Sequence, residues 1–331
     1  MRQIKYIDAV KEALAEEMER DDRVFIIAED VGEYGGVWNE TRGLRDRFGD
    51  LRVMDTPISE AGFTGLCVGA AMAGMRPVTE IMYMDFVTAC MDQLVNQGAK
   101  ADLMSGWQMT VPLTVIMPCG FGTREAGQHS QFLEGWFLTA PGFKVVYPSN
   151  AYDAKGLMKT AVRDDSPVIF IENRNMLYDV SEVPDGTWTI PFGKAKVLSE
   201  GRDITLVTYG GAVPVVREAV RLCQEISAEV IDLRSLLPLD MDAIASSIRK
   251  TGRVLVVHEA PAAFNIGAEI VRRVVERCFD DLDAEPLVYG SQRSVVPFSG
   301  VLEDSIMLKT DRIVELMKRL TYTGHACAIA P

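Results

Sequence analysis

The chain has 331 residues, of which 48% are hydrophobic and 24% are charged, and this composition is typical of a folded globular protein. Its length predicts two domains, because a single hydrophobic core rarely grows beyond about 250–300 residues. The formal net charge of −13 argues against nucleic-acid binding, which normally needs a basic face. No apolar run reaches the roughly 18 residues that cross a bilayer, so we expect no membrane-spanning segment.

The cysteines and the N-terminus indicate a compartment. The six cysteines are scattered and form no Cys-x-x-Cys pair, which is typical of a reducing environment. The opening residues, MRQIKYIDAV, lack the apolar stretch of a signal peptide and are not rich in Arg and Ser as a transit peptide is. We therefore expect a cytoplasmic protein, or a mitochondrial matrix protein if this is a processed eukaryotic chain.

The first half of the chain alternates predicted helices and strands. Asp8 is expected to cap a helix that ends at 21–22, and a buried strand follows at 24–28. A Gly-rich loop, a short strand and a long helix of small residues come next. Further strands are predicted at 113–117, 144–147 and 168–171, with a helix at 151–162. This alternation predicts an α/β domain with a mainly parallel sheet.

A stretch rich in Pro and Gly, SEVPDGTWTIPFG, predicts a domain boundary. We place a first domain at 1–185, a linker at 186–194 and a second domain at 195–331. In the second domain, strands are expected at 204–208, 229–233 and 254–257, and helices at 213–224, 241–249 and 266–279. The sequence thus predicts two doubly wound α/β domains.

Several common motifs are absent from the sequence. It has no Gly-x-x-x-x-Gly-Lys-Ser/Thr phosphate loop, no Gly-x-Gly-x-x-Gly after the first strand, no Gly-x-Ser-x-Gly elbow and no His-Glu-x-x-His pair. The chain therefore offers no standard means of holding a phosphate or a divalent metal by itself.

The three histidines and two acids are the candidate functional residues. His129 lies in a loop after a strand, where α/β proteins place active sites, but a solvated loop histidine fits the pattern equally well. His258 is interpreted as a structural strand-end residue, and His325, near the C-terminus, is assigned no role. Glu60 begins the small-residue helix among apolar neighbours, where a buried carboxyl would keep its proton. Glu29 ends a buried strand and could stand near the same site.

At these residues the chain resembles a known family over almost its whole length. The resemblance rests on EEMERDDRVFIIAEDVGEYGGVW, MDTPISEAGFTGLCVGAAMAGMRPVTE, DFVTACMDQLVNQGAK, GQHSQFLEGWF and EVIDLRSLLPLD. The chain is similar to the β subunit of the thiamine-diphosphate-dependent first component of 2-oxoacid dehydrogenase complexes. Pyruvate, branched-chain and acetoin dehydrogenase β subunits share these segments, so the resemblance identifies the class better than the substrate.

The resemblance implies a transketolase-like fold, with a pyrimidine-binding domain followed by a transketolase C-terminal-type domain. It implies oxidative decarboxylation of a 2-oxo acid, with pyruvate favoured, and transfer of the acyl unit to a lipoyl-lysine of a core acyltransferase. Cleavage of acetoin and a branched-chain substrate are the alternatives. Three other classes are weaker: a self-sufficient thiamine enzyme, a noncatalytic scaffold, and a nicotinamide dehydrogenase.

Site residues follow from the same resemblance. Glu60 would donate a proton to the aminopyrimidine ring of the cofactor, and Phe86 would stack on that ring. Ile58 would join these cofactor contacts. Glu29 matches an acid proposed to pass protons between active sites, and His129 matches a histidine that orients the substrate carboxylate or exchanges protons during acyl transfer.

The resemblance also implies partners and ions. An α subunit would complete an α2β2 heterotetramer and would hold the diphosphate and Mg²⁺ through a Gly-Asp-Gly motif, which this chain lacks. A structural potassium site would use carbonyl groups near Leu113 and Ala161 and the region of Asp164. Ser166 stands where some members of the family have Asn.

Overall fold

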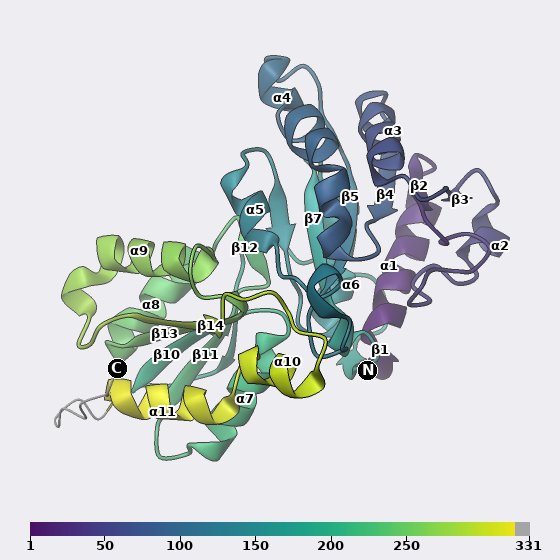
Figure 1. The fold of residues 1–331 in the computed structure, drawn as a ribbon. Helices are drawn as coiled ribbons and strands as arrows, with labels where there is room; N and C mark the ends of the chain where they lie inside the picture. The colour runs from purple at the N-terminus through teal and green to yellow at the C-terminus, as the bar shows by residue number, and fades with distance from the viewer. Residues whose placement is uncertain (322–331) are drawn as a thin grey trace. The chain divides into compact units, whose positions relative to one another are not determined.

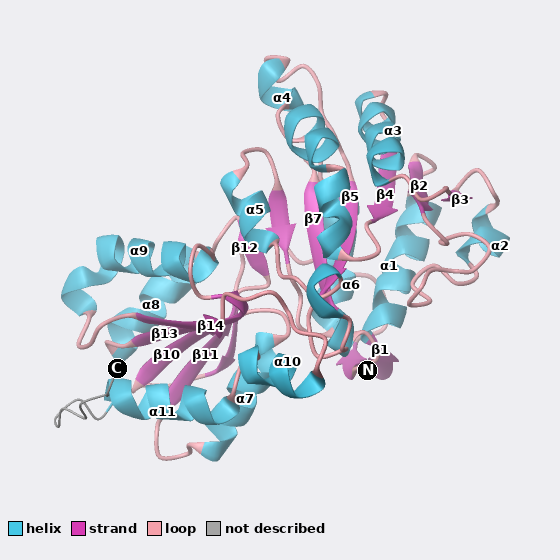
Figure 2. Ribbon diagram, viewed as in Figure 1, coloured by secondary structure: helices cyan, strands magenta, loops and turns pink. Residues whose placement is uncertain are grey.

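The computed structural model describes residues 1–321 and divides into two compact units. The first unit contains residues 1–193, 235–238 and 295–303, and the second contains residues 194–234, 239–294 and 304–321. Each unit is built around its own sheet (Figure 2). His325 and Cys327 lie outside the described residues.

The first unit holds a seven-stranded sheet in the order β12-β6-β7-β5-β4-β2-β3. All neighbouring strands pair in parallel except β12, which pairs antiparallel with β6. Its strands are β2 (Val24–Ala28), β3 (Val53–Asp55), β4 (Arg76–Glu80), β5 (Thr114–Cys119), β6 (Lys144–Val146), β7 (Val168–Asn173) and β12 (Ser235–Leu237). A separate antiparallel pair joins β1 (Arg2–Lys5) to β8 (Val180–Val183).

Helices flank this sheet (Figure 1). They are α1 (Tyr6–Arg20), α2 (Leu44–Phe48), α3 (Glu60–Met72), α4 (Ala101–Met104), α5 (Glu134–Thr139) and α6 (Ala151–Arg163). Shorter helical turns are η1 (Met84–Ala89), the π-helix η2 (Asp92–Gly98), η3 (Ala126–Gln128) and η4 (Arg174–Met176). Val10, Leu14 and Met18 recur on one stripe of α1 and are buried in the core, as an amphipathic helix requires.

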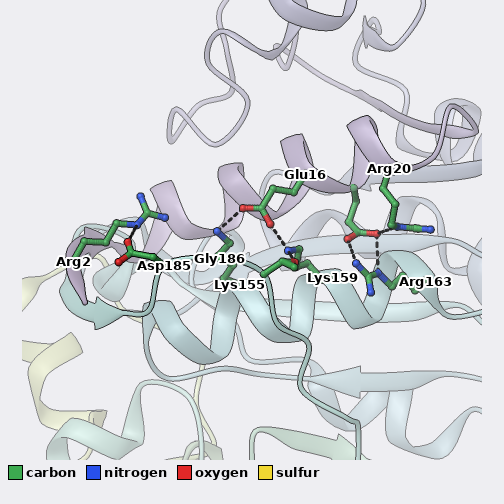
Figure 3. A pocket seen from close by; sticks show the side chains of 10 residues that line it. Arg2, Glu16, Arg20, Lys155, Lys159, Arg163, Asp185 and Gly186 are labelled. Atoms are coloured by element: carbon green, nitrogen blue, oxygen red, sulfur yellow. Dashed lines mark hydrogen bonds and ion pairs between the residues drawn. The ribbon is translucent and has the colours of Figure 1, made fainter.

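Helices α1 and α6 lie side by side and are joined by ion pairs. The ammonium groups of Lys155 and Lys159 are almost fully buried, and both contact the carboxylate of Glu16. Arg163 pairs with Glu17 in the same way. A cavity of about 780 Å³ lies along this seam (Figure 3). Because its lysines are already paired with acids, we interpret the cavity as part of the packing between the two helices.

The second unit contains a five-stranded sheet in the order β14-β13-β10-β11-β9. The strands are β9 (Lys196–Ser199), β10 (Ile204–Thr208), β11 (Ala228–Asp232), β13 (Val254–Pro261) and β14 (Leu287–Ser291). Only β9 pairs antiparallel. The helices after residue 194 are α7 (Ala212–Leu222), α8 (Met241–Thr251), α9 (Ile266–Cys278), η5 (Phe279–Asp281), α10 (Gly300–Ile306) and α11 (Thr310–Thr321).

The alternation predicted from sequence is confirmed, but several elements were not predicted, among them β4, a buried strand in the middle of the first sheet. The predicted strands at 24–28 and 204–208 have the observed bounds. The predicted cap at Asp8 is wrong, because α1 begins at Tyr6 directly after β1, and the Asp8 carboxylate instead accepts a hydrogen bond from Lys11 at 2.9 Å. None of the helices in residues 1–321 combines the length and the apolarity needed to cross a bilayer.

Candidate active site

The candidate residues gather at the carboxyl edge of the first unit's parallel sheet. Glu29 follows β2, Glu60 follows β3, Phe86 follows β4 and His129 follows β5. The chain moves from β2 outward to β3 and then returns to place β4 on the other side of β2. Such a reversal of strand order is where open α/β sheets bind ligands.

Glu29 and Glu60 form an acidic pair at this edge. Both side chains are half-buried, and Glu60 is the first residue of α3. Burial, and after it the charge of Glu60, raises the pKa of Glu29 above its ordinary value. The Oε1 atom of Glu29 is buried and has no hydrogen-bond partner among residues 1–321. Burial and the neighbouring acid therefore both favour the protonated form of Glu29.

Three rings from the segments after β4 and β5 pack edge to face. In the sheet, β4 is the neighbour of β2, the strand that precedes Glu29. The centroid of the Tyr83 ring lies 5.5 Å from that of Phe86 and 4.7 Å from that of His129. Phe86 and His129 are 5.2 Å apart, and Trp38 extends the group with its ring 6.0 Å from Tyr83. The cluster therefore brings together the two ring residues that the sequence singled out, and offers an aromatic surface for a flat ligand.

Asp85 links the segment that contains Phe86 to the segment that contains His129 through hydrogen bonds. Its buried carboxylate accepts hydrogen bonds from the backbone N–H groups of Ser130 and Gln131 at 3.3 Å and from the Gln131 side chain at 2.8 Å. Buried carboxylates require such partners. Residues separated by more than 40 positions in the sequence are thereby held at one place.

Three further carboxyl groups lie buried behind this edge: Glu40, Glu80 and Glu172. Burial, and then the charge of Glu40, raises the pKa of Glu80 well above its ordinary value. Burial likewise raises the pKa of Glu172 to about 8. No ion pair to any of the three is present in the described part of the chain. At neutral pH these groups therefore share protons rather than carry three charges.

The potassium prediction concerns a different corner of the sheet. The carbonyl oxygen of Leu113 accepts from Val168 N at 2.8 Å, and that of Ala161 accepts from Asp164 N at 3.2 Å. The guanidinium of Arg76 donates to the Asp164 carbonyl at 3.0 Å. Lys144 donates to the Asp164 carboxylate at 2.5 Å, so two side-chain cations already lie here.

Acids balance the charges at this corner. Arg76 pairs with Asp165 and Lys144 pairs with Asp164, and each carbonyl oxygen retains a second lone pair. The potassium site therefore stays a prediction. Ser166, which stands in the same segment, donates its backbone N–H to Asp164 at 2.9 Å. Elsewhere in residues 1–321, no group of three or more His, Cys, Asp or Glu side chains is arranged to hold a metal ion.

The other candidates are distributed as follows. Ile58 lies in the loop before α3, and its side chain is 83% exposed, so this chain alone does not enclose it. His258 is fully buried in β13, where Nδ1 bonds to the carbonyl of Ala260 at 3.0 Å and the ring stacks with Tyr209. Burial lowers the pKa of His258 to about 4. The Nε2 atom of the same ring is buried and has no hydrogen-bond partner among residues 1–321. The structural role of His258 therefore stays a prediction.

Sequence reasoning missed the residues that support the site. Arg174, Tyr83 and Glu125 carry no motif, and the strand-end position of Arg174 was the only signal available. The guanidinium of Arg174 is 1% exposed and contacts Glu125. Its Cζ atom lies 4.8 Å from the centroid of the Tyr83 ring. These contacts become visible only when β4, β5 and β7 are placed side by side.

Comparison with known families covers most of the chain. Residues 2–179 match the pyrimidine-binding domain family of transketolase, and residues 193–313 match the transketolase C-terminal domain family. The fold is similar to that of a solved split-gene transketolase described as an inactive β4 tetramer. The TM-score is 0.79 at 19% sequence identity, covering 97% of this chain and 99% of that chain.

Curated relatives are similar over their full length. The pyruvate dehydrogenase E1 component subunit β of Rickettsia bellii is 42% identical over 97% of this chain and 99% of its own. The acetoin:2,6-dichlorophenolindophenol oxidoreductase subunit β of Bacillus subtilis is 43% identical, covering 96% and 97%. The 2-oxoisovalerate dehydrogenase subunit β of Bacillus subtilis is 42% identical, covering 97% and 99%. The chain therefore belongs to the family of transketolase-like β subunits of 2-oxo acid and acetoin dehydrogenases.

Proposed function

We propose that this chain is the β subunit of a thiamine-diphosphate-dependent dehydrogenase that decarboxylates a 2-oxo acid, with pyruvate favoured. The observation that carries the proposal is the meeting of an acidic pair and an aromatic cluster at the switch point of the sheet. A planar heteroaromatic cofactor needs both a ring surface and a group that can exchange a proton with a ring nitrogen. The family to which the chain belongs supports the same cofactor.

The residues of this chain fit one half of the cofactor. When bound, thiamine diphosphate supplies an electron sink for cleavage of the bond beside a carbonyl carbon. Glu60 would hold a proton on its carboxyl group and share it with the aminopyrimidine ring. Phe86 would contact that ring, and Ile58 would be covered by ligand or partner. The buried, unsatisfied Oε1 of Glu29 would exchange protons with Glu60.

His129 would act on the substrate side of the site. Its ring makes edge-to-face contacts with Tyr83 and Phe86, which restrict its orientation. An imidazole can donate a hydrogen bond to a substrate carboxylate and can exchange a proton during transfer of the acyl group to lipoyl-lysine. The noncatalytic scaffold is less well supported, because the side chains of Glu60 and His129 are half-buried rather than exposed.

The rest of the cofactor site would come from a partner. We propose that an α subunit holds the diphosphate and Mg²⁺, that two copies of each subunit form an α2β2 heterotetramer, and that a lipoyl-bearing core acyltransferase receives the acyl group. The printed names of the relatives as β subunits support a partner. The sequence has no Gly-Asp-Gly, so the diphosphate-binding half would lie outside this chain.

The substrate is the least constrained part of the proposal. Relatives named for pyruvate, acetoin and 2-oxoisovalerate are 42–43% identical to the chain, so overall similarity does not separate them. Pyruvate is favoured because more of the similar relatives are named for pyruvate than for acetoin or 2-oxoisovalerate. An acetoin dehydrogenase β subunit is the first alternative, and a branched-chain one is the second.

Two further parts of the assignment are proposals of the same kind. We place residues 186–194 as the linker between domains at 1–185 and 195–331, a proposal supported by the unmatched residues 180–192 between the two family matches. We propose a cytoplasmic location, or the mitochondrial matrix in a eukaryote. A relative from Dictyostelium discoideum carries the word mitochondrial in its name.

The test is reconstitution. Thiamine diphosphate with Mg²⁺ is titrated by calorimetry into this chain alone and into the chain assembled with its α subunit. We expect binding only in the assembled protein, followed by turnover of pyruvate in preference to acetoin or branched 2-oxo acids. Tight binding by this chain alone would contradict the split site, and turnover of acetoin alone would select the first alternative.

A further inference from the structure

The loop that carries His129 has little regular structure of its own. It runs from the end of β5 to α5 and contains only the three-residue turn η3. Arg124 and Ala126 adopt positive φ angles of 65° and 60°, which non-glycine residues rarely do. A loop in such a conformation is held by contacts from outside, because its own backbone preferences oppose it.

Arg174 supplies several of those contacts at once. Its Nη2 group donates to the carbonyl oxygen of His129 at 2.5 Å, to Thr123 Oγ1 at 3.0 Å and to the carbonyl of Gly120. Its Nη1 group donates to the carboxylate of Glu125. One guanidinium, placed by the end of β7, thus binds the loop at four positions between Gly120 and His129.

The same arginine also reaches the ring against which His129 packs. Its Cζ atom lies 4.8 Å from the centroid of Tyr83, and the Tyr83 hydroxyl donates to Glu125 at 3.2 Å. Glu125 also accepts from Thr123 at 2.8 Å. The backbone of His129 and its ring neighbour are therefore fixed by one connected group of polar and aromatic contacts.

A second contact holds the opposite side of the loop. The carboxylate of Glu303 accepts from the backbone N–H of Gly122 at 2.6 Å and from Arg124 at 2.8 Å. Removing Arg174 would consequently leave the loop attached but free to shift at its His129 end. We therefore expect His129 to be displaced while the protein as a whole stays folded.

We propose that Arg174 is a positioning residue that sets the orientation of His129 through the loop backbone and Tyr83. The proposal rests on the proposed function in so far as His129 acts on the substrate. Arg174 itself is not a substrate ligand, since its guanidinium is 1% exposed. A planar fork with five N–H donors can bind this many acceptors, which a lysine ammonium with three donors on a flexible stem does not reproduce.

The sheet offers a matched control at its opposite edge. Arg52 donates to the carbonyl oxygens of Val24 at 2.6 Å, Met18 at 3.0 Å and Asp21 at 3.2 Å. Its Cζ atom also lies over an aromatic ring, 5.9 Å from the centroid of Phe48. Arg52 therefore makes the same kinds of contact as Arg174 without touching the loop of His129.

The first measurement follows the His129 ring directly. Histidine labelled with ¹³C at Cε1 gives three signals in the full chain, because it contains three histidines, and His129→Gln identifies one of them. We expect Arg174→Met, and to a lesser degree Arg174→Lys, to move or broaden the His129 signal while that of His258 stays in place. Arg52→Lys should leave both unchanged. An unmoved His129 signal in Arg174→Met, in a protein that keeps its near-ultraviolet circular dichroism, overturns the proposal.

The second measurement uses the protein assembled with its α subunit. Arg174→Met should lower kcat about tenfold to a hundredfold, as misplacement of a catalytic group does, with KM changed less than threefold. In a His129→Gln background the same change should cost less than threefold, because the group to be positioned is gone. An equal loss in both backgrounds refutes the positioning role.

The two measurements separate the two levels of inference. If His129→Gln retains full activity while Arg174→Met still moves the His129 signal, the role proposed for His129 fails and the positioning by Arg174 stands. If Arg174→Met does not fold, Glu125→Gln replaces it, since this change removes the anion between Arg174 and Tyr83 and keeps the volume. It should shift the His129 signal in the same direction by a smaller amount.

Discussion

The two units use the same α/β architecture, but their sheets hold buried glutamates in different ways. In the second unit, Glu229 is buried in β11 and pairs with Lys250. Burial opposes ionisation there, yet the hydrogen bonds from Lys250 and Ser247 outweigh it and lower the pKa of Glu229. In the first unit, burial raises the pKa values of Glu80 and Glu172, and neither makes an ion pair within residues 1–321.

This difference separates a structural sheet from a functional one. A buried acid that serves only stability is neutralised by a cation beside it, because an unpaired charge costs several kcal/mol. Acids that are kept without cations near the end of a sheet store protons instead, and such groups concentrate at active sites. The Glu29 and Glu60 pair lies at the outer rim of the same acidic region.

The largest expected effect tests the Glu29 and Glu60 pair. Glu60→Gln keeps the side-chain volume but removes the carboxyl proton, so kcat of the assembled enzyme should fall by about a hundredfold or more. Asp242→Asn, which changes an acid in the first turn of α8 in the other unit, should leave kcat within twofold. Steady-state kinetics of the two variants, side by side, decide the point. Near-normal turnover in Glu60→Gln would show that the Glu60 carboxyl group is not needed for the mechanism.

The second effect concerns the interior of the first unit. Glu172 has a folded pKa of about 8 and an ordinary value of 4.5, so the folded state binds the extra proton between these pH values. Its contribution to stability is therefore complete below pH 4.5 and is lost as the pH rises toward 8, by roughly 4–5 kcal/mol at about 1.4 kcal/mol per pKa unit.

Glu172→Gln should consequently remove this pH dependence. Urea unfolding between pH 5 and pH 9 should show the parent weakening more steeply than the variant. A control substitution at the paired acid Glu229, Glu229→Gln, should not flatten the curve in this range. Parallel curves for the parent and Glu172→Gln would show that Glu172 titrates normally.

The second unit should respond to pH in the opposite direction. His258 is buried and neutral, and its pKa is about 4 in place of 6.5. The unfolded chain binds the proton first as the pH falls, so the stability contributed by neutral His258 is complete above pH 6.5 and is lost toward pH 4, by about 3 kcal/mol. His258→Gln should make unfolding less dependent on pH between 4 and 6.5. An unchanged slope would contradict the buried neutral ring.

The smallest effect concerns potassium. Because the carbonyl oxygens of Leu113 and Ala161 already accept backbone hydrogen bonds, replacing K⁺ by choline should shift Tm by less than about 2 °C, which corresponds to under about 1 kcal/mol for a chain of this size. Differential scanning calorimetry at constant ionic strength measures the shift, with Na⁺ as the control ion. A rise of 5 °C or more specific to K⁺ would establish the potassium site despite these hydrogen bonds.

Much of the fold could be predicted because its signals are local. Apolar runs such as 24–28 and 204–208 form strands, since a strand buried on both faces needs an unbroken apolar sequence. The strands β1, β8 and β9 were missed because they are half-exposed and carry polar residues. The start of α1 was misplaced for the same reason, as β1 runs directly into the helix. The buried central strand β4 was also missed, because its sequence, RPVTE, has no continuous apolar run.

The sequence by itself determined the family and the two α/β sheets, because both are recognised from short continuous segments. The candidate residues Glu29, Glu60, Phe86 and His129 lie in such segments. The tertiary structure decided what surrounds them. Asp85 meets Ser130, and Arg174 meets His129, only because parallel strands far apart in the chain end at one edge of a sheet. A hydrogen bond depends on two atoms being about 3 Å apart in space, and the distance between two residues along the sequence does not indicate this. Such partners could therefore be identified only from the tertiary structure.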